Sequence, residues 1–112
     1  MKRYEIWRAE LPSAANSHVQ QGVRPVIIVS NDAANTHSPV VTVVPLTSQC
    51  KKPLPTHVLI REQGLSTSST ALCEQIITVD KSRLIKRIGY LLNTFDRLAL
   101  CHALSVQLGM AA

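Results

Sequence analysis

The chain has 112 residues, and its 12 Lys and Arg against 7 Asp and Glu give a formal net charge of +5. Hydrophobic residues make up 46% and charged residues 17%, a balance that excludes an intrinsically disordered chain and is normal for a globular protein. We expect one domain, residues 1–112, because two halves would each be too small to bury a core. No apolar run approaches the roughly 20 residues that cross a bilayer, which predicts a cytoplasmic protein outside the membrane.

The cysteines and the net charge indicate the redox compartment and the kind of partner. Cys50, Cys73 and Cys101 are odd in number and widely spaced, which is typical of a reducing compartment and gives neither a disulfide framework nor a metal-binding pattern. The cysteines therefore predict no zinc knuckle; separately, we expect no metal ion and no cofactor. The positive charge favours an anionic partner, either a nucleic acid or an acidic protein.

The first half of the chain indicates three strands. Residues 4–11 alternate and end at Pro12, residues 26–30 are a β-branched run typical of a strand buried on both faces, and residues 40–46 repeat that pattern. Pro45 predicts an edge strand or a bulge, because proline has no N–H for the ladder. Residues 13–23, and the segment holding Asn35, His37 and Pro39, are expected to be loops.

The second half indicates two more strands and two helices. The strands are expected at residues 56–61 and 70–79. Asp80 is a candidate cap for a short helix that ends at Gly89 and carries four basic residues, Lys81, Arg83, Lys86 and Arg87. Asn93 or Thr94 is expected to cap a longer helix over residues 95–108.

Apolar residues surround most of the helix at 95–108, so we expect it to pack on the sheet with one face and to lie near a subunit contact with another. About five short strands and a C-terminal helix predict an α+β, mainly β protein. Its expected form is a small SH3-like barrel of antiparallel strands followed by the helix.

Several segments occur in a fixed order: Arg24-Pro25 with the following VIIVSND, the stretch VVTVVPLTSQ, LPTHV at 54–58, Cys73-Glu74-Gln75, and the run from Thr78 to Leu84. Together they resemble the MazF/PemK (Kid) family of toxin endoribonucleases. The similarity covers roughly residues 4 to 109. Each segment alone is a weak signal, but the ordered set is a strong one.

The resemblance implies the MazF/PemK/CcdB-like toxin fold and a homodimeric toxin of a type II toxin–antitoxin module. It implies metal-independent cleavage of single-stranded RNA at short sequences, leaving a 2′,3′-cyclic phosphate and a 5′-hydroxyl. It also implies inhibition by a cognate acidic antitoxin, with operator DNA bound only through the toxin–antitoxin complex.

Cleavage through the RNA 2′-hydroxyl needs a base, a donor for the phosphate oxygens and an acid for the leaving oxygen. Arg24 suits the phosphate, because a guanidinium is planar and always charged, and the resemblance places the catalytic arginine there. Thr47 is a second catalytic candidate at a strand end, and Glu74 matches the position of the family's base. His18 and Arg24 both remain candidates for the acid, because Leu72 stands where the Kid-like branch has an arginine.

A further set of polar residues is expected to bind RNA: Ser48, Gln49, Lys51, Lys52, His57, Gln75 and Gln20. For several candidate residues, an interpretation without a role in RNA binding or catalysis stays open. A lysine pair on a loop is often simply solvated, His18 can be a solvated loop side chain, and His57 can be structural. Few aromatic residues are present, so stacking is not expected to be the main source of RNA specificity.

Two other classes of function remain. A non-catalytic, CcdB-like inhibitor of gyrase would share the fold, but this chain ends without the tryptophan-containing tail of that group. A degenerate toxin that serves as an antitoxin-binding or operator-binding component is the other alternative, because Ser17, Val19 and Leu72 depart from the family pattern.

Overall fold

The computed structural model describes residues 1–49, 52–62 and 64–110. Over these residues the chain forms seven strands, two α-helices and two short 3-10 helices. The strands are β1 Glu5–Leu11, β2 Gly22–Ile28, β3 Val40–Thr47, β4 His57–Ile60, β5 Ser69–Leu72, β6 Ile77–Asp80 and β7 Leu84–Tyr90. The helices are α1 Asp32–His37, η1 Cys73–Gln75, η2 Lys81–Arg83 and α2 Thr94–Gln107.

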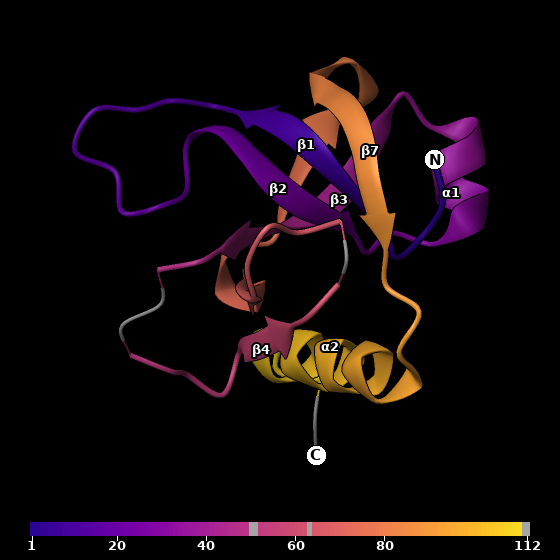
Figure 1. Ribbon diagram of the computed structural model, residues 1–112. Coiled ribbons are helices and arrows are strands. Elements are labelled where there is room, and N and C mark those ends of the chain that lie inside the picture. The colour runs from indigo at the N-terminus through magenta and orange to yellow at the C-terminus, as the bar shows by residue number, and fades with distance from the viewer. Residues whose placement is uncertain (50–51, 63, 111–112) are drawn as a thin grey trace.

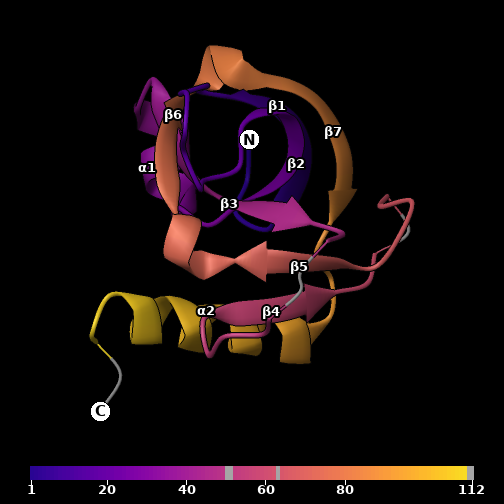
Figure 2. The same cartoon turned by 90° about the vertical axis from the view of Figure 1, so that its left-hand side faces the viewer.

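The strands are antiparallel and follow the order β4-β5-β3-β2-β1-β7, with β6 paired to β3. Strand β3 joins two sheets, because Val40–Val43 pair with β6 while Leu46 and Thr47 pair with β5. In Figures 1 and 2 the sheet of β1, β2, β3, β6 and β7 rolls into a small barrel, and β5 and β4 lie between it and α2. This is the barrel-like, mainly β fold expected from the sequence.

Strand β3 contributes side chains to two hydrophobic clusters, because successive side chains along a strand point to opposite faces. Val41 and Val43 pack in the barrel interior with residues such as Val26. Val44 and Leu46 point the other way, into a cluster that includes buried residues of β4 and α2. The second cluster packs α2 against the small sheet of β4 and β5 and so helps to position the start of β4.

The C-terminal helix is confirmed, and Asn93 is its N-cap, since the Asn93 side chain accepts a hydrogen bond from the N–H of Asp96. Leu100 and Ala103 are buried against the sheet. Phe95 and Leu98 instead point to solvent, with 82% and 62% of their surface exposed. One apolar face is therefore covered within the chain and another is not. Neither α-helix described in this chain is long and apolar enough to cross a membrane.

The single strand expected at 70–79 is wrong: β5 ends at Leu72, η1 follows, and β6 begins at Ile77. The break lies opposite Val44 and Pro45, between the part of β3 that pairs with β6 and the part that pairs with β5. Pro45 cannot donate a ladder hydrogen bond, and β3 is an interior strand, so the proline marks an interruption of the ladder and not a sheet edge. In η1, which occupies this interruption, Cys73 is buried while Glu74 and Gln75 are partly exposed.

Three other expectations need correction. The helix after Asp80 is limited to η2, and Leu84–Tyr90 is the edge strand β7, paired with β1. The expected loop before Pro39 contains α1, which Asn31 caps and whose buried Asn35 bonds to Ser30. Strand β2 begins at Gly22 and ends at Ile28, earlier than expected at both ends. These changes raise the number of strands from about five to seven.

Candidate functional site

Arg24 and Thr47 lie on neighbouring strands, close to the point where the pairing of these strands stops. Strand β2 pairs with β3 as far as Val26 and Pro45; Arg24 lies two residues before Val26, and Thr47 lies two residues after Pro45. Because side chains alternate along a strand, Arg24 is on the same face of β2 as Val26, and Thr47 is on the same face of β3 as Pro45. Two of the expected catalytic residues therefore lie just beyond the same end of this ladder.

Arg24 and Thr47 differ in exposure and in how many of their polar side-chain atoms are already hydrogen-bonded. The Arg24 side chain is exposed, and its Nε–H is donated to the carbonyl oxygen of Gln21 at 3.1 Å. Within the described parts of the chain, the two terminal nitrogens of Arg24 have no hydrogen-bond partner. Thr47 is buried, and its hydroxyl oxygen accepts the N–H of Gln49 at 3.2 Å. The guanidinium is thus held at one nitrogen and available at the others.

Glu74 lies on η1, and its carboxylate is fastened to the start of β4. The Glu74 Oε2 atom is 2.7 Å from Nε2 of His57, and Oε1 is 3.4 Å from the hydroxyl of Thr56. The side chain of Glu74 remains 27% exposed, whereas that of His57 is only 9% exposed. No hydrogen bond or ion pair joins Arg24 or His18 to Glu74 within the described residues, and His18 lies exposed in the loop between β1 and β2.

The loop between β1 and β2, which projects from the body in Figure 1, is tied to η1. The backbone N–H of Gln20 donates to Oε1 of Gln75 at 2.7 Å. Beside this bond lies a cavity of about 270 Å³. It is lined by Pro12, Ala14, Val19, Gln20, Pro45, Glu74, Gln75, Ile76 and Ile77. The buried Oε1 atom of Gln20 has no hydrogen-bond partner among the described residues.

The remaining expected RNA contacts are spread over the end of β3 and the segment that follows. Ser48, Gln49 and Lys52 are exposed, and Ser48 also lines a cavity of about 230 Å³ together with Arg8, Pro25 and the 64–69 segment. Lys51 lies outside the described residues. The structure therefore gathers Gln20, Gln75, Glu74 and His57 closely, and Ser48 directly follows the strand end at Thr47.

Sequence reasoning missed Thr56 and the link between His57 and Glu74. The two linked residues are 17 positions apart, and only the pairing of β4 with β5, which sets His57 opposite Leu72, brings them together. Next to Glu74, burial and then the charge of that carboxylate raise the pKa of the Cys73 thiol to about 12. Cys73 therefore stays protonated at neutral pH and is not a nucleophile of the site.

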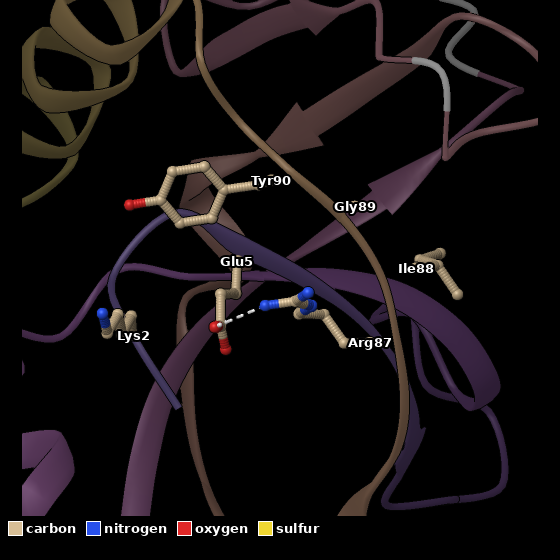
Figure 3. A pocket seen from close by; sticks show the side chains of 6 residues that line it. All are labelled: Lys2, Glu5, Arg87, Ile88, Gly89 and Tyr90. Carbon is tan, nitrogen blue, oxygen red and sulfur yellow. Dashed lines mark hydrogen bonds and ion pairs between the residues drawn. The ribbon is translucent and has the colours of Figure 1, made fainter.

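Another pocket, of about 570 Å³, lies between β1 and β7 and is shown in Figure 3. Its lining residues are Lys2, Glu5, Arg87, Ile88, Gly89 and Tyr90, none of which was expected in the site. Glu5 Oε2 is 3.3 Å from Arg87, and Glu5 Oε1 accepts the indole N–H of Trp7 at 2.9 Å. The buried carboxylate thus links the two strands, and we interpret this pocket as structural.

Over the described ranges, no group of three or more His, Cys, Asp or Glu side chains is arranged to hold a metal ion.

Comparisons with known proteins show close relatives. The family model for the PemK-like, MazF-like toxins of type II toxin–antitoxin systems matches residues 2–107. The endoribonuclease EndoA of Bacillus subtilis (strain 168) is 42% identical over 94 residues, which are 81% of this chain and 80% of that protein. The endoribonuclease MazF of Staphylococcus saprophyticus is 40% identical over 94 residues, 81% of this chain and 78% of that protein.

Solved structures confirm the fold. A mycobacterial endoribonuclease in complex with its cognate antitoxin matches with a TM-score of 0.83 at 26% identity, covering 100% of this chain and 98% of that one. The Mycobacterium tuberculosis toxin MazF-mt6 matches with a TM-score of 0.80 at 27% identity, covering 96% and 99%.

Proposed function

Because this chain belongs to the PemK-like, MazF-like toxins of type II toxin–antitoxin systems, with relatives that are endoribonucleases, we propose that it cleaves single-stranded RNA at short sequences without a metal ion. The matched range supports treating residues 1–112 as a single toxin domain. The observation that carries the site assignment is Arg24: an exposed guanidinium, fixed through Nε alone, at the end of the β2–β3 ladder beyond which Thr47 also lies.

The proposed reaction uses the RNA itself as nucleophile. The 2′-oxygen forms a bond to phosphorus while the bond from phosphorus to the 5′-oxygen breaks, which leaves a 2′,3′-cyclic phosphate and a 5′-hydroxyl. Glu74 takes the proton of the 2′-hydroxyl, and His18 or Arg24 returns a proton to the leaving oxygen. Arg24 and the Thr47 hydroxyl stabilise the charge that develops on the phosphate oxygens. No water attacks, so the reaction needs no metal-bound hydroxide.

The RNA contacts that we propose surround this centre. Ser48, Gln49, Lys51 and Lys52 follow Thr47 along the chain and would meet the phosphates on one side of the cleaved bond. Gln20 and Gln75 line the cavity beside Glu74 and offer amide groups to a base edge. His57 was also expected to contact RNA, but its enclosed ring reaches this centre through its bond to Glu74.

An antitoxin partner is supported by the mycobacterial relative, which was solved with its cognate antitoxin. The net charge of +5 favours an acidic segment of that partner. Operator DNA would then be bound only through the toxin–antitoxin complex, and the proposed RNA substrate favours action in the cytoplasm.

We also propose a homodimer. Phe95 and Leu98 lie three residues apart on the outward face of α2, and the preceding Leu92 is 70% exposed. Contiguous exposed apolar side chains mark interaction surfaces in proteins of this size. A second copy of the chain would cover them, as expected from the sequence.

The test is incubation of the purified protein with a long single-stranded RNA in EDTA. Discrete fragments are expected, and Arg24→Ala should lower the rate by about 100- to 1,000-fold, the usual cost of removing one donor to a developing oxyanion. Arg83→Ala, an exposed arginine on η2, is the matched control and should cleave normally. Absence of cleavage by the wild-type protein, or cleavage that requires a divalent ion, would overturn the assignment. Gyrase inhibition without cleavage would favour a CcdB-like function, and antitoxin binding without either activity would favour a degenerate toxin.

A further inference from the structure

The imidazole of His57 lies between two elements of the small sheet and reaches the candidate base. Its side chain is 9% exposed, and Nε2 is 2.7 Å from Oε2 of Glu74. On the other side of the ring, Nδ1 accepts the backbone N–H of Leu54 at 3.1 Å. An imidazole this enclosed has little surface left for RNA.

These two contacts determine which nitrogen of His57 carries the proton. A backbone N–H can only donate, so Nδ1 must be the unprotonated acceptor toward Leu54. The neutral ring then carries its proton on Nε2, which donates to Glu74.

The backbone around the pair is fixed by the same pairing of strands. His57 lies opposite Leu72 in the ladder of β4 and β5. The carbonyl oxygen of Thr56 accepts the N–H of Cys73 at 3.0 Å, which attaches the first residue of η1 to the start of β4. The side-chain bond between His57 and Glu74 is a second link between β4 and η1, one residue further along each segment.

We infer that His57 is a positioning residue for Glu74: its Nε2–H holds Oε2 in place and leaves Oε1 as the atom that receives the 2′-hydroxyl proton. This inference rests on the proposed function of Glu74 as the base. Oε1 has only the 3.4 Å contact from Thr56 to compete with that proton. Displacement of a catalytic group by about 1 Å can cost on the order of 100-fold in rate, so fixing the carboxylate has a measurable effect.

The decisive variants are His57→Leu, which removes the donor, and His57→Gln, whose amide nitrogen can still donate from near the position of Nε2. We expect His57→Leu to lower the single-turnover rate constant by on the order of 10- to 100-fold while RNA affinity changes less than about twofold. His57→Gln should recover most of that rate. In a Glu74→Ala background, His57→Leu should cause little further loss, because the histidine acts through the carboxylate. A loss of RNA affinity at unchanged rate, or full additivity with Glu74→Ala, would overturn the inference.

A second readout does not depend on cleavage. Nitrogen-15 spectra of the full chain should show His57 protonated at Nε2 and unprotonated at Nδ1, with the Nε2–H signal protected from exchange. Glu74→Ala should remove that protection and leave the rest of the spectrum folded. An Nδ1-protonated ring in the wild-type protein would contradict the inference. If wild-type protein fails to cleave RNA but shows the protected Nε2–H, the proposed function fails while the pair itself stands.

Discussion

The side-chain oxygen of Gln75 accepts a hydrogen bond from the backbone N–H of Gln20, with an N···O distance of 2.7 Å across 55 residues of sequence. The contact joins the β1–β2 loop to η1 at the edge of the cavity that Glu74 lines. Because the side-chain oxygen of Gln75 holds the loop in this way, the β1–β2 loop forms one side of the candidate site.

Gln75→Ala should release the loop. Removing the acceptor leaves the Gln20 N–H without its partner, so we expect faster proteolysis within residues 13–21 and weaker RNA binding, with the melting temperature nearly unchanged. Limited proteolysis followed by mass spectrometry measures the first effect. Gln107→Ala, at the exposed end of α2, is the control. Equal cleavage of the loop in both variants would show that the bond does not hold it.

Gly64→Ala should destabilise the protein. A Cβ atom at Gly64 would lie 1.7 Å from the carbonyl oxygen of Ile88, which is backbone of β7 and cannot swing away. We expect a loss of roughly 1–3 kcal/mol in the free energy of unfolding, measured by urea denaturation. Gly89 faces the same contact from the other side, but a Cβ there would meet its nearest atom only at 3.6 Å. Gly89→Ala should therefore cost less; the reverse order would contradict this packing.

Glu5 should contribute to acid sensitivity. Burial alone would raise the pKa of Glu5, but hydrogen bonds from the Trp7 indole, at the Lys2 backbone and from Arg87 outweigh it and leave the pKa below its usual value of 4.5. A lowered pKa in the folded state stabilises the fold when Glu5 is ionised, and this stabilisation is lost as pH falls from 4.5 through the folded pKa. Glu5→Gln should flatten the acid limb of the stability profile. Parallel acid limbs in chemical denaturation would refute the role of this carboxylate.

Phe95→Asp should dissociate the proposed dimer. The aromatic ring is 82% exposed on α2, so within one chain the change removes almost no packing, whereas in a dimer it buries a charge. Sedimentation equilibrium should show a dimer for the wild-type protein and a monomer for the variant. Leu54→Asp, at a side chain 49% exposed before β4, is the control and should remain dimeric. A wild-type monomer at micromolar concentration would remove the proposal.

The parts of the structure that the sequence predicted are those with a local signal. The β-branched runs that form β2 and β3 predicted the strands around Arg24 and Thr47, and Asn93 predicted the start of α2. Strand β7 was missed because its basic residues fall at helix-like spacing, while its actual partner is β1, far away in the sequence. The bond between His57 and Glu74 was missed for the same reason, since it depends on the register of two strands and on the interruption at Pro45.

The most direct measurement compares two synthetic RNAs that contain the same cleavage site, one all-ribose and one with a single 2′-deoxy nucleotide on the 5′ side of the cleaved linkage. If the 2′-oxygen is the nucleophile beside Arg24 and Glu74, the all-ribose strand is cut in EDTA to a 2′,3′-cyclic phosphate and a 5′-hydroxyl. The substituted strand is bound but left intact. Cleavage at the deoxy position, or a 5′-phosphate on the product, would contradict this chemistry.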